Sequence, residues 1–161
     1  TLEEIAAGLS SVHGHEFDEE TWPAVLYGET DIVDDNGMFL RHRRLQAPKV
    51  LTWRSFLSGM LVCHQSFYVR TDIARQFHYN LRYRFSGDFD WCIRIMKDAQ
   101  QQGQSLFNTR MVLTDYLSEG MTTKNHRKSL LERFRIMCRH YGCVQTIRQH
   151  LWFVVRAMVR P

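Results

Sequence analysis

Residues 85–95, FSGDFDWCIRI, place two carboxylates, Asp88 and Asp90, two positions apart inside an aromatic and apolar run. Ser86 precedes them at a position where a hydroxyl can cap a helix, and the helical pattern continues to about Gln101. Apolar residues recur at helical spacing in two rows, Phe89 with Ile93 and Met96, and Trp91 with Ile95. The stretch therefore predicts a helix that packs on a core and begins with an acidic first turn.

The acidic pair has two interpretations. An aspartate in the first turn of a helix is stabilised by the helix dipole and by free N–H groups, which explains Asp88 better than Asp90. However, three aromatic side chains surround the pair, and desolvation with a like charge nearby predicts a raised carboxylate pKa. Such a carboxylate is suited to taking a proton from a hydroxyl. Gly87 would let a bulky ligand approach the backbone, as group transfer to an alcohol requires.

Composition limits the class of protein. The chain has 161 residues, of which 44% are hydrophobic and 12% aromatic, so it is long enough for one globular domain with a core. Its four cysteines form no C-x-x-C pair, which indicates reduced thiols in a cytosolic protein. The chain begins at Thr1 without a signal-peptide pattern, and we expect it to be part of a larger protein.

The net charge of +4 is unevenly distributed. Residues 1–35 carry ten acidic side chains and no Lys or Arg. Residues 124–161 carry nine Lys or Arg against Glu132 alone, a balance of +8. A basic end with an acidic start indicates a surface that meets phosphates, either of nucleic acid or of anionic lipid.

The first third of the chain predicts a helix over residues 2–12 and then a β-hairpin over residues 24–45. The hairpin is predicted because residues with strand character flank Asn36-Gly37, a strong turn signal. The acidic residues near this turn do not fit a calcium loop, since Ile32 stands at the first ligand position and no Glu stands at the twelfth. We interpret them as part of the turn; they are Asp31, Asp34 and Asp35.

The middle of the chain predicts short elements. LTWRSFLSG is a short helix with Thr52 as N-cap and Gly59 as its stop. MLVCHQSFYVR is an interior strand or an extended loop, and TDIARQF is a helical turn or two. SLFNTRMVLTDYL, residues 105–117, gives one or two short strands.

Two helices are predicted from Lys124 onward, divided near Gly142. The first has an apolar stripe suited to core packing, formed by Leu130, Phe134, Met137 and Tyr141. The second mixes arginines with apolar residues, namely Ile147, Leu151, Val154, Val155 and Met158. Its apolar run is far shorter than the about 20 residues needed to span a bilayer. It is either a basic amphipathic helix on an anionic membrane surface or a core helix whose arginines reach solvent.

Four segments resemble the C-terminal half of bacterial family 2 glycosyltransferases, in the group with WcaA-like members that build surface polysaccharides. They are YGETDIVDDNGMFL (27–40), LTWRSFLSGMLVCHQSFYVR (51–70), YNLRYRFSGDFDWCIRIMKDA (79–99) and YLSEGMTTKNHRKSLLERFRIMCRHYG (116–142). The resemblance covers nearly the whole chain in one consistent order.

The resemblance implies an α/β GT-A fold, a Rossmann-like sandwich that binds a nucleotide-sugar donor. Family members usually bind a divalent metal, Mg or Mn, through a D-x-D motif. The family's nucleotide-binding strands and its D-x-D motif lie upstream of the part represented here. We therefore expect a fragment that ends in two helices, has no metal ligands of its own and is inactive by itself; the metal is expected in the full-length enzyme.

The resemblance also implies roles for single residues. The acidic motif that opens a helix matches SGDFDW, where Asp88 takes the position of the base that deprotonates the acceptor hydroxyl. Asp90 matches a second acidic position and would orient a neighbour or the acceptor. His64, Gln65 and Trp91 are expected to contact the sugar or acceptor, although a buried His64 bonded to backbone is an equal alternative.

A loop over the donor diphosphate is matched by SEGMTT and the residues that follow it. Its expected phosphate donors are Ser118, Thr122, Thr123, Lys124, His126 and Arg127. A helix cap at Thr123 would explain part of this pattern without any ligand.

The sequence thus predicts residues 1–123 as the C-terminal part of a catalytic domain and residues 124–161 as basic helices. The expected activity is inverting transfer of a sugar from a nucleotide-sugar donor to a glycan or lipid-linked acceptor. The expected location is the cytoplasmic face of the membrane, with the basic helices near an anionic surface. The alternative is a nucleic-acid-binding module that uses the same helices; no recognised DNA- or RNA-binding signature supports it.

Overall fold

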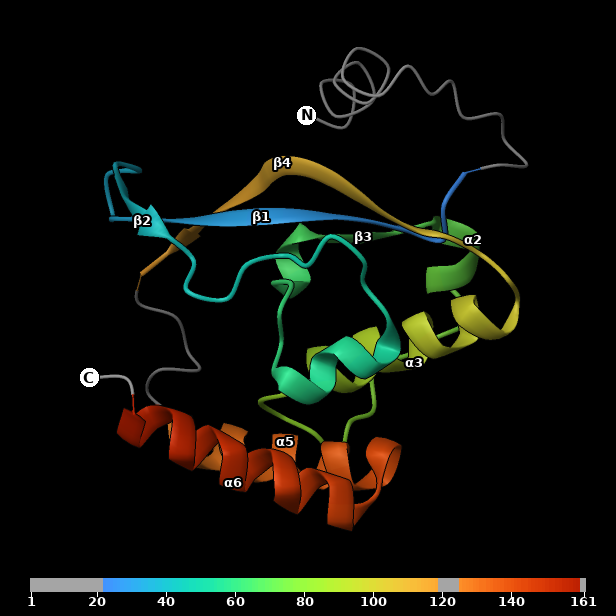
Figure 1. Cartoon of the computed structure of the whole chain (residues 1–161). Helices are drawn as coiled ribbons and strands as arrows, with labels where there is room; N and C mark the ends of the chain where they lie inside the picture. Colours follow the sequence, from blue (N-terminus) through green and yellow to red (C-terminus); the bar gives the residue numbers. More distant parts are fainter. Residues whose placement is uncertain (1–21, 119–124, 160–161) are drawn as a thin grey trace.

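The computed structural model describes residues 22–118 and 125–159. They form a mixed α/β structure in which helices cover one side of a four-stranded sheet (Figure 1). Beneath the sheet lies a layer with the central helix α3 (Gly87–Gln101), and beneath that lies the pair α5 (His126–Tyr141) and α6 (Cys143–Val159). The helix predicted over residues 2–12 lies outside the described residues.

Strand β1 (Val25–Val33) is the centre of the sheet. On one edge it pairs in parallel with β4 (Leu106–Leu117) along its whole length. Its other edge is shared by two antiparallel strands, β2 (Phe39–His42) at one end and β3 (Phe67–Val69) at the other. The sheet is therefore mixed, and β1 is buried between its neighbours.

The predicted hairpin is confirmed as β1 and β2. Gly37 has φ 78°, a conformation that a residue with a side chain rarely adopts. The Asp34 carboxylate accepts the N–H groups of Asn36 at 2.9 Å and Met38 at 2.8 Å. Asp34 thus stabilises the turn, as interpreted from the sequence, whereas Asp31 bonds His42 of β2.

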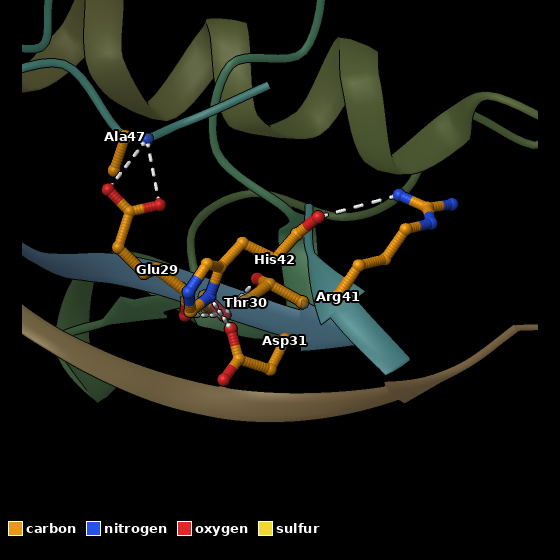
Figure 2. Close-up of polar contacts among 7 residues, drawn as sticks. Glu29, Thr30, Asp31, Arg41, His42 and Ala47 are labelled. Atoms are coloured by element: carbon orange, nitrogen blue, oxygen red, sulfur yellow. Dashed lines mark hydrogen bonds and ion pairs between the residues drawn. The ribbon is translucent and has the colours of Figure 1, made fainter. Parts of the chain in front are cut away.

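Polar side chains of β1 fix the segments that pack beside the strand (Figure 2). The contacts are Glu29 with the Ala47 N–H at 3.1 Å, Thr30 with Ser66 at 2.6 Å and Asp31 with His42 at 2.8 Å. The Thr30–Ser66 bond is buried. It therefore helps to place the segment that contributes His64 to the site described below.

Strand β4 is one long strand, whereas the sequence predicted one or two short ones. Its register against β1 shifts on both sides of Glu29, and Arg110 has φ 55°. The irregular part lies over Gly28, where an added Cβ would overlap the Met111 carbonyl oxygen and come within 2.7 Å of Thr109 Oγ1. The bulge therefore requires glycine at position 28.

Helix α3 is the predicted helix, with Ser86 at the N-cap position and the predicted end at Gln101. Its buried side chains include both predicted rows except Trp91, which is half-buried. The prediction that the Ser86 hydroxyl caps the helix is wrong. That hydroxyl is buried and bonds Ser129 of α5, at 3.0 Å to the hydroxyl and 3.2 Å to the carbonyl.

Short elements connect the sheet to the helices. The 3₁₀ helix η1 (Trp53–Ser58) lies between Thr52 and Gly59, as predicted. The segment predicted as a strand or extended loop divides into the 3₁₀ turn η2 (His64–Ser66) and β3. The predicted helical turn after it is α2 (Thr71–Ala74). These connections bring His64 beside the start of α3.

The two C-terminal helices are confirmed, with Gly142 between them at φ 87°. Helix α5 begins at His126 with Asn125 at the N-cap position, and the predicted cap, Thr123, lies outside the described residues. Ile136 and Met137 of α5 belong to the same buried cluster as α3, so the core continues across the predicted boundary at residue 124.

Helix α6 presents an exposed apolar face. This face comprises Val144, Ile147, Leu151, Val154, Val155 and Met158, among which Leu151 is 62% exposed and Met158 is 79% exposed. The core-helix interpretation of these residues is therefore wrong. No helix in residues 22–118 and 125–159 has the length and hydropathy needed to cross a bilayer.

Candidate active site

Asp88 lies in the first turn of α3 and its carboxylate faces His64 of η2. The distance from Asp88 Oδ2 to His64 Nδ1 is 3.1 Å. Both side chains line a cleft of about 210 Å³. We call it the Asp88 cleft; its other lining residues are Ile32, Arg43, Met60, Cys63, Tyr116 and Arg133. Asp88 and His64, which the sequence predicted as separate site residues, are thus brought together from positions 24 residues apart in the chain.

The charge on Asp88 is favoured by its neighbours. Burial by itself would raise the pKa of the Asp88 carboxyl, but the hydrogen bond and positive charge of His64 outweigh it and lower that pKa. The sequence-based prediction of a raised pKa is therefore wrong. Asp90 does not supply the expected repulsion, because its own charge is neutralised elsewhere. Asp88 is ionised throughout the neutral pH range and can accept a proton.

His64 is the cationic member of this pair. The hydrogen bond to Asp88 is the largest cause that raises the pKa of His64 to about 9. The imidazole is exposed at its outer side and bonds a carboxylate, so the alternative of a buried His64 bonded to backbone is wrong. A histidine that is protonated at neutral pH cannot serve as the base. Proton acceptance in this cleft therefore falls to Asp88.

Asp90 serves a different purpose from Asp88. Its side chain is 1% exposed and accepts hydrogen bonds from Arg94 Nε and His140 Nε2, both at 2.8 Å. Burial raises the pKa of Asp90, but these two bonds outweigh it and lower the pKa below the usual value. Asp90 therefore joins α3 to α5 and does not line the Asp88 cleft. Of its two expected roles, the geometry favours orientation of neighbours.

The other two residues predicted to contact the acceptor, Gln65 and Trp91, lie in different places relative to the cleft. Gln65 lies beside the cleft, where its side-chain oxygen accepts a hydrogen bond from Cys63 Sγ at 3.4 Å. Trp91 does not line the cleft; its indole N–H donates to the Phe77 carbonyl at 2.7 Å and its ring stacks on Tyr79. Tyr79 also lies 3.5 Å from the position of a Cβ on Gly87. A Cβ at position 87 would make ordinary van der Waals contact with Tyr79, and the close approach of a ligand at Gly87 stays a prediction.

The predicted phosphate-binding set is only partly described. Thr122, Thr123 and Lys124 lie outside the described residues. Ser118 follows β4 and its N–H donates to the Val33 carbonyl at 3.1 Å. His126 is the first residue of α5, and Arg127 beside it is exposed. Neither Ser118 nor Arg127 is among the residues that line the Asp88 cleft.

Sequence reasoning missed the two arginines of the cleft. Arg43 is held by three carbonyl oxygens, those of Leu45, Met60 and Leu61, at 2.7 to 3.0 Å. Nothing in the local sequence around Arg43 signals its two distant partners, Met60 and Leu61. Arg133 had a usable signal, because it interrupts the apolar stripe of α5 between Leu130 and Met137. Its Nε is buried and has no hydrogen-bond partner among the described residues.

The cleft carries more positive than negative charge. Arg43, Arg133 and the protonated His64 face one carboxylate, Asp88. Burial opposes ionisation of the Cys63 thiol in the same cleft, but hydrogen bonds with His64 and Gln65 and the charge of Arg43 lower its pKa. A region with this charge favours ligands that bear negative charge or develop it during a reaction.

A second, larger cavity adjoins the cleft, and we call it the apolar groove. It has a volume of about 780 Å³ and lies between η1, α5 and α6. Its apolar lining includes Leu45, Met60, Phe89, Met137, Phe153 and Val154. Three arginines also line it, Arg44, Arg133 and Arg156. Arg133 and Met60 line both cavities, so the two are neighbours.

The described residues contain no cluster of three or more His, Cys, Asp or Glu side chains that could hold a metal ion. No family model, curated protein or solved structure matches the chain.

Proposed function

We propose that this chain carries the acceptor side and the catalytic base of an inverting glycosyltransferase with a GT-A fold. The proposal rests on the sequence resemblance to family 2 glycosyltransferases and on one structural observation. That observation is an ionised carboxylate, Asp88, at the start of α3 and on the wall of a cleft. The motif residue expected to be the base therefore has the exposure and protonation state that a base needs.

The proposed reaction is a direct displacement. The acceptor hydroxyl gives its proton to Asp88 while its oxygen forms a bond to the anomeric carbon of the donor sugar. The bond between that carbon and the diphosphate oxygen breaks, and the nucleoside diphosphate leaves with the electron pair. A partly desolvated carboxylate in hydrogen-bond reach of the hydroxyl is sufficient for the proton transfer.

The positive charge of the cleft supports this role in a second way. Negative charge develops on the leaving diphosphate oxygen in the transition state, and fixed cations nearby stabilise it. Arg133 and His64 are available for this, whereas Arg43 is bound to backbone carbonyls and serves to hold the cleft together. The divalent metal that the resemblance implies has no ligand set in the described residues, and no step of the proposal passes through it.

The proposal includes the location of the enzyme. The exposed apolar face of α6, together with Arg148 and Arg156 on the same helix, suits the surface of an anionic membrane on the cytoplasmic side. The acceptor would then be a glycan or lipid-linked glycan of cell-surface polysaccharide synthesis. This apolar face also disfavours the nucleic-acid-binding alternative, because contacts to phosphates require polar and cationic groups at the surface.

The experiment is a transfer assay with the protein in which this chain is joined to its donor-binding half. Asp88→Asn should lower the rate of sugar transfer roughly 100-fold or more, because it removes the proton acceptor. Donor binding should change far less than the rate, because in this account Asp88 contacts the acceptor hydroxyl and not the donor. Near-normal transfer by Asp88→Asn would assign the base to another residue.

A further inference from the structure

We propose that Cys138 and Cys143 form a site of reversible oxidation, at which a low-molecular-weight disulfide converts the two thiols into a disulfide that ties the end of α5 to the start of α6. The site is independent of the proposed function, because neither cysteine is among the residues that line the Asp88 cleft or the apolar groove. Three observations carry the proposal: the turn that places the two cysteines, the contact between their thiols and their unequal exposure.

The turn between α5 and α6 brings the two cysteines together. Cys138 lies in the last turn of α5, and Cys143 is the first residue of α6. The N–H of Gly142 donates to the Cys138 carbonyl at 3.0 Å, so the chain turns back over the end of α5. A residue that follows such a turn commonly contacts a side chain near the end of the helix. Here that contact is a hydrogen bond between the two thiols.

The turn is held by bonds that oxidation of the sulfurs leaves in place. Thr146, which is buried, donates both its N–H and its hydroxyl to the Gly142 carbonyl, at 3.1 and 2.9 Å. A disulfide requires two Cα atoms about 4.4–6.8 Å apart, and cysteines whose thiols already touch need little backbone movement to reach that geometry. The turn is therefore suited to both the dithiol and the disulfide.

Exposure assigns an order to the two thiols. Cys143 is exposed, whereas Cys138 is half-buried. Burial is the largest cause that raises the pKa of Cys138, and the hydrogen bond with Cys143 raises it further. Because the thiolate is the attacking species, Cys143 reacts first with a disulfide in solution and Cys138 reacts second. The other two cysteines, Cys63 and Cys92, are buried.

The reaction consists of two successive thiol–disulfide exchanges. The deprotonated Cys143 sulfur attacks one sulfur of the small disulfide, forms a mixed disulfide and releases one small thiolate. The deprotonated Cys138 sulfur then attacks the Cys143 sulfur, closes the protein disulfide and releases the second small thiolate. The protein gives up two electrons and two protons, which reduce one small disulfide to two thiols. Both cysteines are free in the structure, and an excess of small thiol returns the oxidised site to this state.

The first experiment treats the purified protein with glutathione disulfide and follows the product by intact mass and peptide mapping. Wild type should lose two hydrogen atoms and yield a bridge between Cys138 and Cys143, and dithiothreitol should reverse the change. Cys138→Ser should stop at a mixed disulfide on Cys143, because the second exchange has lost its thiol. Cys143→Ser should form no internal bridge.

The matched control is Cys63→Ser, which removes a thiol outside the pair and should oxidise like wild type. A bridge that maps to Cys63 and Cys92 would overturn the proposal. So would a disulfide-linked dimer as the main product of wild type, or a Cys138→Ser protein that still loses two hydrogen atoms.

The second experiment tests whether the bridge ties α6 to α5. A cross-link restricts local opening, so the amides of residues 143–146 should exchange with deuterium roughly tenfold or more slowly in the oxidised protein than in the reduced protein. The amides of β1 serve as the internal control and should exchange equally in both states. Equal exchange at residues 143–146 in the two states would contradict the tie between the helices.

Discussion

Asp88 and Asp90 show how two helical steps place neighbouring carboxylates in different surroundings. Residues two positions apart on a helix do not face each other, since each step rotates by about 100°. Asp88 consequently faces the cleft and His64, while Asp90 is buried against Arg94 and His140. The two carboxylates are close in the sequence but have different partners in the structure.

The pairing of His64 with Asp88 predicts a measurable pKa. An NMR titration of the assigned His64 imidazole should give a pKa of about 9, against an ordinary value of 6.5. Asp88→Asn removes the largest cause of this shift, so the pKa should fall toward 6.5. If the pKa of His64 is already near 6.5 in the wild-type protein, the ion pair does not exist in solution.

The same pair makes a contribution to stability that is confined to a pH window. The raised pKa of His64 means that its contribution is full below pH 6.5 and is lost as the pH rises through about 9. The lowered pKa of Asp88 means that its contribution is present above its unfolded-state value of 3.8 and is lost as the pH falls below it. Thermal unfolding of wild type and His64→Asn should therefore differ between these limits and converge above about pH 10.

Asp90 predicts a stability effect. Asp90→Asn should lower the free energy of unfolding by about 3 kcal/mol, since it leaves Arg94 and His140 without their shared carboxylate in a buried place. The control is Asp98→Asn on the same helix, which should stay within about 0.5 kcal/mol of wild type. Urea unfolding measures both. An Asp90→Asn loss no larger than that of the control would show that the buried bonds contribute little.

At the scale of elements, the contact between β1 and β4 makes a prediction at Gly28. Gly28→Ala should lower the free energy of unfolding by roughly 2–3 kcal/mol, because the new methyl overlaps a backbone carbonyl in the bulge of β4. Gly87→Ala is the matched control, with its nearest neighbour at 3.5 Å, and should be close to neutral. If chemical denaturation gives the same loss of unfolding free energy for Gly28→Ala and Gly87→Ala, the bulge of β4 adjusts to the added methyl at little cost.

Elements with local signals could be predicted from the sequence. Asn36-Gly37 predicted the hairpin, Gly59 and Gly142 marked the ends of helices, and the apolar rows after Ser86 predicted α3. The long parallel pairing of β1 with β4 could not be predicted, because residues about 80 positions apart meet there and no local pattern encodes it. The role of Ser86 was missed for the same reason, since its partner lies on α5.

The candidate site could be predicted only where a motif marks it. Asp88 and His64 were identified from the motif and the resemblance, and the structure brings them into contact. Their protonation states were not predictable, because the repulsion expected from Asp90 is cancelled by partners on another turn and another helix. Arg43 was missed because two of its three carbonyl partners, Met60 and Leu61, lie 17 and 18 positions further along the chain.

For the whole molecule, the exposed apolar face of α6 predicts binding to a membrane surface. In a co-sedimentation assay, a larger fraction of the protein should pellet with vesicles that contain anionic lipid than with vesicles of neutral lipid. Leu151→Glu should weaken binding roughly tenfold or more, since it places a charge on the apolar face.

A matched control separates the loss of apolar contact from the effect of adding a negative charge to α6. Gln145→Glu adds the same charge at an exposed position of α6 that does not belong to the apolar face, so it should reduce binding much less. Equal loss in the two variants would indicate simple charge repulsion. Absence of binding to anionic vesicles would reject the membrane contact itself.

The central claim is that Asp88, held ionised by His64, accepts the proton of the acceptor hydroxyl. The measurement that tests it most directly is the pH dependence of kcat/KM for sugar transfer in the wild-type protein and in His64→Asn. The account predicts that the acid limb moves to higher pH in His64→Asn, because burial still raises the pKa of Asp88 while its main lowering partner is gone. An acid limb that stays at the same pH in the two proteins would show that the titrating base is not Asp88.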